Sequence, residues 1–102
     1  MGRKRPDRTA RRADERAARA LVRDREKLAV LSPGGTAEHP ISVTSSAVIE
    51  VRVSAMPCPQ CAGEYRVVDH EAPPGLRKVS VTCRLCGVSR VLWFKIVVDE
   101  PN

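Results

Sequence analysis

Four cysteines stand in two pairs of identical spacing, and they are the residues in this sequence best suited to chemistry. The pairs read Cys58-Pro-Gln-Cys61 and Cys83-Arg-Leu-Cys86, with 21 residues between them. Two thiolates in one tight turn can reach the same ion, and a second such turn beside the first completes a tetrahedral set of sulfurs. The spacing therefore predicts one metal site made of Cys58, Cys61, Cys83 and Cys86.

Other uses of these cysteines are two disulfides, a redox Cys-x-x-Cys motif or four unrelated buried thiols. Disulfides need an oxidising compartment, and the charged N-terminus has no apolar segment of the kind that targets a protein for secretion, so we expect a cytoplasmic protein. A redox motif needs only one pair and a βαβ context that is missing. Four protein ligands leave no position for water, so we expect one structural Zn²⁺, with iron as the alternative.

The order of turn, hairpin, turn and long apolar strand resembles the zinc-ribbon family. The resemblance covers about residues 56–98 and rests on the four cysteines together with Gly87, which directly follows the second pair. It implies a small antiparallel fold around one structural zinc. Zinc ribbons occur in transcription factors, RNA-polymerase subunits, ribosomal proteins and transposases, and as protein-docking modules. The resemblance therefore favours a binding role without fixing the partner.

One branch of this family, the transcript-cleavage elongation factors, carries adjacent Asp and Glu ahead of a Pro at the hairpin tip, where they hold a catalytic Mg²⁺ in the polymerase active site. Here the expected tip reads Asp69-His70-Glu71-Ala72-Pro73, so His70 separates the two carboxylates. The resemblance implies a minor alternative function in which Asp69 and Glu71 act in transcript cleavage. A solvated hairpin tip is the simpler interpretation of the same residues.

The positive charge of the chain is confined to its N-terminal third. Residues 1–31 hold 11 Lys and Arg against 5 Asp and Glu, whereas residues 32–102 hold 7 of each. From Asp7 to Leu31 the chain has no Gly or Pro and is rich in Ala, Arg, Glu and Leu, which predicts a helix with Asp7 as its N-cap and a frayed segment 1–6 before it. The run Ser32-Pro33-Gly34-Gly35 predicts its end.

Basic residues recur at steps of three or four along this helix and form one stripe. A solvated charged face is one interpretation and a phosphate-binding surface the other. On the other side of the helix, we expect the C-terminal half to dock through Leu21, Leu28 and Leu31. Ion pairs within the helix, such as Glu15–Arg19, are expected to stabilise it by about 0.3 kcal/mol each. The stripe consists of Arg5, Arg8, Arg12, Arg16, Arg19, Arg23 and Lys27.

Residues 32–46 have the composition of a linker, with a short extended piece at Ile41–Val43. Residues 47–55 alternate between apolar and mixed positions, with Ile49, Val51 and Val53 on one face, which predicts a half-buried strand. The chain is thus expected to divide into a basic helix (1–31), a linker (32–46) and a zinc-ribbon domain (47–102).

Two further strands are expected at residues 65–68 and 79–82, joined by a turn at Pro73-Pro74-Gly75. The last strand, 88–98, is apolar on both faces, which is typical of a central strand covered on two sides. The strand 47–55 and the docked helix are the expected covers, and a second copy of the chain, in a homo-oligomer, is the alternative.

The expected fold class is therefore a small α+β domain stabilised by a bound metal ion. It consists of a long basic helix followed by a zinc ribbon with a three- to four-stranded antiparallel sheet. The expected function is binding of RNA or DNA largely through phosphates, within the transcription or ribosome machinery. Arg84, which lies between Cys83 and Cys86, is expected to add a contact. A protein-interaction adaptor is the alternative. We expect no enzyme, because no catalytic triad, phosphate-binding loop or open metal site is present, and no membrane span.

Overall fold

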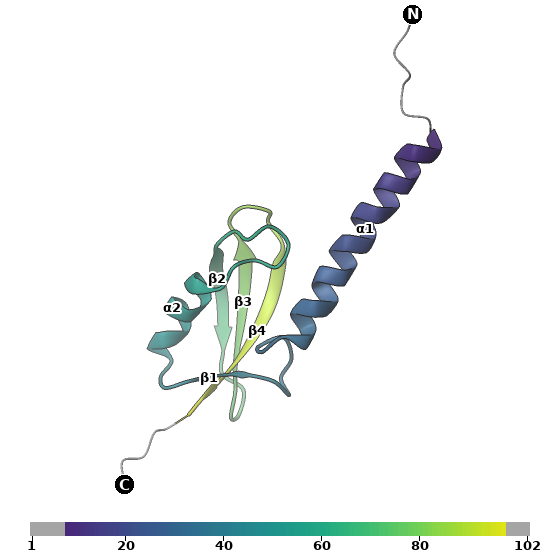
Figure 1. Cartoon of the computed structure of the whole chain (residues 1–102). Helices are drawn as coiled ribbons and strands as arrows, with labels where there is room; N and C mark the ends of the chain where they lie inside the picture. Colours follow the sequence, from purple (N-terminus) through teal and green to yellow (C-terminus); the bar gives the residue numbers. More distant parts are fainter. Residues whose placement is uncertain (1–7, 98–102) are drawn as a thin grey trace, which may run out of the picture.

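The computed structural model describes residues 8–97, which form two helices and four strands (Figure 1). This content makes the chain an α+β fold. No helix in this part of the chain is long and apolar enough to cross a membrane. The elements follow one another as α1 (Arg8–Leu31), β1 (Ile41–Val43), α2 (Ala47–Ala55), β2 (Tyr65–Glu71), β3 (Arg77–Cys83) and β4 (Ser89–Ile96).

The four strands form one sheet in the order β1-β4-β3-β2. β2 and β4 run antiparallel to β3, as expected, whereas β1 runs parallel to β4 with Ile41 opposite Phe94. The prediction of a purely antiparallel sheet is therefore wrong at this edge. The reason lies in the preceding loop: the carbonyl of Gly34 accepts a hydrogen bond from the N–H of Trp93 at 2.8 Å, so the chain joins β4 there and then runs alongside it.

The predicted hairpin is present and longer than expected. β2 and β3 each span seven residues, and the register shifts between Val67 and Asp69, where β2 carries an irregularity. The turn contains Pro73-Pro74-Gly75, and Gly75 has a φ of 76°, a left-handed conformation that glycine adopts without strain. Because β2 begins beside the end of the antiparallel β3, with Tyr65 opposite Cys83, this hairpin holds the two cysteine turns at the same end of the sheet (Figure 1).

Residues 47–55 form the helix α2, so the prediction of a strand is wrong. Ile49 and Val53 are 0% and 1% exposed, whereas Val51 is 70% exposed. These two buried positions are four residues apart and share one face of a helix. The alternating pattern is equally compatible with a short helix that buries every fourth residue, and packing against the sheet selects that helix.

The core lies between α2 and one face of the sheet. Its largest fully buried side chains come from α2, β3 and β4: Phe94, Ile49, Val53, Val79, Val81 and Cys83. On β4, Leu92 and Phe94 are buried, but Val91 and Trp93 on the other face are only half-buried. The prediction that β4 is covered on two sides is therefore wrong for the described residues, because α1 does not cover the second face.

The predicted N-terminal helix is observed as α1, and its proposed cap Asp7 lies outside the described residues. None of its residues is buried. The expected docking through leucines is wrong: Leu21, Leu28 and Leu31 are 49%, 65% and 80% exposed. Only the C-terminal part of α1 lies beside the ribbon, defined here as residues 56–97, and the rest projects away from it (Figure 1).

The end of α1 is fixed to the sheet by a tight loop. The N–H of Gly34 donates to the carbonyl of His39 at 2.6 Å, and Gly34 has a φ of 86°. A Cβ at this position would lie 2.7 Å from Cδ1 of Ile41, so both the conformation and the space require glycine. The predicted stop after Leu31 is therefore also the point at which the helix is attached to β4 through Trp93.

Candidate metal centre

The two cysteine turns, or knuckles, have the same backbone hydrogen bonds. In the first knuckle (58–63), the N–H of Cys58 donates to the carbonyl of Gly63 and the N–H of Ala62 donates back to Cys58, at 2.9 and 2.7 Å. In the second knuckle (83–88), Cys83 bonds to Val88 and Gly87 in the same two ways, at 2.9 and 3.1 Å. The structure therefore repeats one local geometry at both ends of the predicted site.

A left-handed residue follows the second cysteine of each knuckle. Ala62 has a φ of 63° and Gly87 a φ of 79°. This conformation turns the following backbone toward the sulfurs: the N–H of Gly63 donates to Sγ of Cys61 at 3.4 Å. A Cβ on Gly63 would lie 2.9 Å from Sγ of Cys83, so a small residue is required beside the site.

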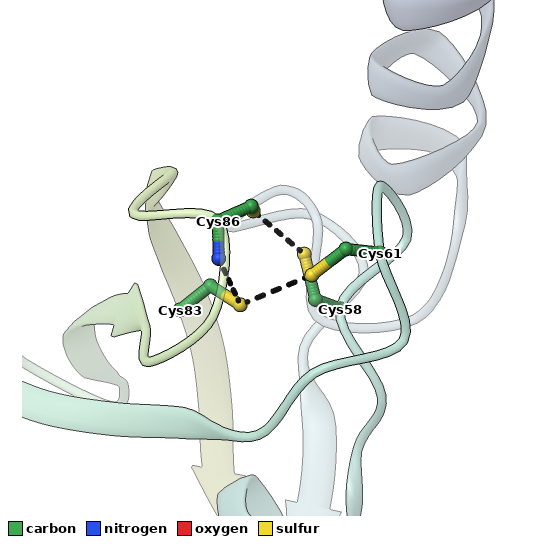
Figure 2. Close-up of side chains that lie close together, drawn as sticks. All are labelled: Cys58, Cys61, Cys83 and Cys86. Atoms are coloured by element: carbon green, nitrogen blue, oxygen red, sulfur yellow. Dashed lines mark hydrogen bonds between the residues drawn. The ribbon is translucent and has the colours of Figure 1, made fainter.

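The four sulfur atoms point toward one another in the space between the knuckles (Figure 2). All four lie within 4.8 Å of one another, with Cys58 and Cys86 3.8 Å apart and Cys61 and Cys83 3.4 Å apart. A tetrahedron with Zn–S distances of about 2.3 Å has edges of about 3.8 Å. The four predicted ligands are thus brought together at distances that suit one metal ion.

The backbone and the neighbouring thiols change the acidity of two cysteines in opposite directions. At Cys83, N–H donors from Cys86 and Leu85 outweigh burial and lower the pKa to about 6. At Cys61, the N–H of Gly63 lowers the pKa, but burial and the three other thiols together raise it to about 12. The cluster therefore combines an acidic thiol with one that keeps its proton, and a thiolate-binding cation displaces such a proton when it binds.

The four cysteines differ in their exposure to solvent. Cys58 and Cys83 are buried beneath the knuckles, Cys61 is half-buried and Cys86 is exposed. All four ligand positions come from the protein, which leaves no room for a water or substrate ligand on a tetrahedral ion. The arrangement can hold a metal ion and connect two turns of the chain, as a structural site does.

Sequence analysis did not identify the residue that joins this site to α1. Gln60 lies between the two cysteines of the first knuckle, and its side-chain amide donates to the carbonyl of Val22 at 3.0 Å and to Glu26 at 2.9 Å. In return, the guanidinium of Arg25 donates to the carbonyl of Gln60 at 2.9 Å. These partners are 34 to 38 residues apart, so no local pattern in the sequence could have indicated them.

A second link to α1 starts from β4. The guanidinium of Arg90 donates to both carboxylate oxygens of Glu26, at 2.5 and 2.6 Å, and to the hydroxyl of Tyr65 at 2.8 Å. The hydrogen bonds from Arg90 are the main cause of a lowered pKa at Glu26. Burial raises the pKa of Tyr65 to about 12, although Arg90 beside it acts in the opposite direction.

The structure describes six of the seven residues of the basic stripe, since Arg5 lies outside residues 8–97. At 100° per residue the six fall within an arc of about 100° on one side of α1. All are exposed, and none forms an ion pair within the described part of the chain, where Glu15 likewise does not pair with Arg19. The six residues are Arg8, Arg12, Arg16, Arg19, Arg23 and Lys27.

Other predicted site residues lie apart from the stripe. Arg84 is exposed on the second knuckle, where its N–H donates to the carbonyl of Glu64. Asp69 and Glu71 lie within β2 rather than at the hairpin tip, because the strand continues to Glu71 and the turn begins after it. Both are exposed, and Glu71 is 3.9 Å from the ammonium group of Lys78.

Comparison with known proteins finds no family model that matches the chain, and no curated protein or solved structure with significant similarity to it.

Proposed function

We propose that the four cysteines hold one structural Zn²⁺ and that residues 56–97 are a zinc ribbon. Support comes from the all-sulfur ligand set, the repeated knuckle geometry and the short distances between sulfurs. Zinc prefers four thiolates in a tetrahedron and needs no redox chemistry to remain bound. A domain of this size with few large buried side chains also needs a bound metal ion, or a similar cross-link, to be stable.

We further propose that the chain binds the phosphate backbone of RNA or DNA through the basic stripe of α1. The single observation that carries this proposal is the set of six exposed cationic side chains on one side of α1, none of them ion-paired within residues 8–97. Six cations facing solvent together attract a polyanion strongly, and they release its counterions when they neutralise its phosphates.

Recognition of this kind is expected to be independent of base sequence. Arginines on one face of an exposed helix contact phosphates, and specificity requires side chains that reach base edges. Of the three aromatic side chains, Tyr65 and Phe94 are buried in the core and only Trp93 is half-buried, so no row of aromatic side chains is available for stacking on successive bases. The ribbon then positions the helix, and the exposed Arg84 adds one further contact.

The test compares two variants that lose the same amount of charge. The stripe variant replaces Arg12, Arg16, Arg19 and Arg23 with Gln, and the control variant replaces Arg52, Arg66, Arg77 and Lys95, which lie outside α1, with Gln. Affinity for short RNA and DNA duplexes is measured across a salt series. For six contacts the plot of log K against log salt has a slope of about −5, and the stripe variant loses about 3 to 4 of that slope.

The control variant should keep a slope close to that of the unmodified chain. Equal losses in both variants would show a diffuse charge effect and would contradict a role for the stripe. Absence of binding at low salt would reject nucleic acid as the ligand altogether.

A second candidate function is a protein-interaction adaptor. It is favoured by the apolar side of α1, where Leu21, Leu28 and Leu31 are exposed, and by the half-buried Trp93 on the open face of the sheet. An adaptor of this type docks a protein partner or a second copy of the chain. If the duplex-binding experiment fails, the molecular mass in solution and Leu28→Glu then test the adaptor directly, because a charge there disrupts an apolar contact.

A further inference from the structure

The direction of α1 depends on contacts at two points along the helix. The first point is its C-terminal loop, where Gly34 accepts the hydrogen bond from Trp93. The second is the helical turn that contains Val22, Arg25 and Glu26, which carries the hydrogen bonds to Gln60 and Arg90. A helix fixed at one end can pivot about it, whereas a second contact one to two turns away sets its direction.

Apolar packing contributes little to this second contact. α1 buries none of its residues, and a hollow of about 200 Å³ lies between its end and the ribbon. The hollow is lined on one side by Ala29 and Pro33 and on the other by Pro59 and Leu92. The polar links therefore carry the orientation, and tightly interdigitated side chains, which normally fix one helix against its neighbours, do not.

One of these links belongs to the metal site itself. Gln60 stands in the four-residue loop between Cys58 and Cys61, and both its backbone carbonyl and its side chain bond to α1. The shape of this loop is set by hydrogen bonds within the knuckle and by the approach of Sγ of Cys61 to the other sulfurs (Figure 2). A cation bound by the four sulfurs would hold this approach in place.

We infer that α1 docks on the first knuckle and that Gln60 is the residue that positions it. Metal bound by the four cysteines holds this knuckle and thereby fixes the direction in which the basic stripe projects. The inference rests on the proposed function for its biological meaning, because the stripe is the surface that is oriented. It gives the first knuckle a second role besides contributing two metal ligands: through Gln60 it sets how the helix is presented to a polyanion.

The test removes the side-chain hydrogen bonds of Gln60 to Val22 and Glu26, while the metal and the pair of Arg90 with Glu26 stay in place. In the zinc-loaded chain, α1 and the sheet should behave as one rigid body. Residual dipolar couplings of amides in residues 20–31 and in β3 and β4 should therefore fit one alignment tensor. Gln60→Ala should require a separate tensor for α1. Leu85→Ala is the matched control, because Leu85 occupies the same position in the second knuckle, is 73% exposed and has no hydrogen bond to α1 among the described residues.

Cobalt absorption spectra check that both variants still bind a tetrahedral ion through four sulfurs. One common tensor in Gln60→Ala would overturn the inference, as would a separate tensor in Leu85→Ala, which would indicate that any change in a knuckle loosens the helix.

Duplex binding separates this inference from the proposed function. Gln60→Ala is expected to bind about threefold to tenfold more weakly than the unmodified chain, because an unoriented helix loses more freedom on binding. Its salt slope should not change, since the same cations meet the phosphates. If neither protein binds, the proposed function fails while the tensors still report on orientation. A separate tensor with unchanged affinity would overturn the claim that the direction set by Gln60 matters for presenting the stripe.

Discussion

Tyr65 is the residue whose ionisation reports most directly on the packing of the ribbon. It is 2% exposed, and its hydroxyl accepts a hydrogen bond from Arg90 beside the first knuckle. Burial in this position disfavours the charged phenolate and raises its pKa from the ordinary value of 10 to about 12. Tyr65 is also the only tyrosine in the chain, so its titration can be observed without interference from another.

Alkaline pH is therefore expected to destabilise the fold through this residue. Because the pKa of Tyr65 is higher in the folded than in the unfolded chain, the stabilisation is fully present below pH 10 and is lost as the pH rises toward 12. Phenolate absorbance should titrate with a midpoint of about 12 in the native protein and near 10 in denaturant. A native-state midpoint near 10 would contradict the burial of the hydroxyl.

Among the elements, α2 shows how far a local pattern can mislead. Its β-branched residues and alternation are typical of a strand, and Ser46 at its start makes no side-chain capping bond that would stabilise the helix locally. What selects the helix is the docking of Ile49 and Val53 into the core formed by β2, β3 and β4. A stretch of nine residues carries no information about such long-range packing.

Two identical substitutions in α2 distinguish the helix from the predicted strand. Val53→Ala removes a side chain that is 1% exposed and should lower the free energy of unfolding by about 2 kcal/mol. Val51→Ala, at a position 70% exposed, should change it by less than about 0.5 kcal/mol, because alanine favours a helix. A strand would place both residues on one face, so equal losses in urea denaturation would contradict the helix.

The parts of the fold that could be predicted are those encoded over short spans. The cysteine spacing, the turn at Pro73-Pro74-Gly75 and the Gly-free, Ala-rich run up to Leu31 each indicated the local structure that is observed. The contact between Gln60 and Glu26 could not be predicted, because it joins residues 34 positions apart and each is an unremarkable polar residue by itself. The docking of α1 was therefore assigned to leucines, although polar side chains mediate it.

At the scale of the whole molecule, the two halves should respond differently to loss of metal. The ribbon has a small core in which two ligands, Cys58 and Cys83, are themselves buried, whereas α1 buries nothing. Bound zinc contributes on the order of 10 kcal/mol to the folding of small domains of this kind. Under the proposed structural role of the metal, residues 56–97 are therefore expected to depend on the ion, whereas α1 is expected to depend mainly on its own backbone hydrogen bonds.

Treatment with a chelator is expected to abolish the near-ultraviolet circular dichroism of Trp93 while part of the helical signal remains. Zinc should restore the native spectrum with one ion per chain. Cys83→Ser should resemble the chelated protein and should not recover when zinc is added. A native-like spectrum and melting temperature in metal-free protein or in Cys83→Ser would show that the cysteines are not a structural metal site.

The parallel pairing of β1 with β4 also constrains the order of folding. Ile41 pairs with Phe94, and Gly34 bonds to Trp93, so the segment that follows α1 finds its partner more than 50 residues later in the chain. Contacts of such separation close large loops and form late. During synthesis on a ribosome, the hairpin and both knuckles emerge before β4 is complete. α1 therefore has no attachment through Gly34 until the last strand has been made.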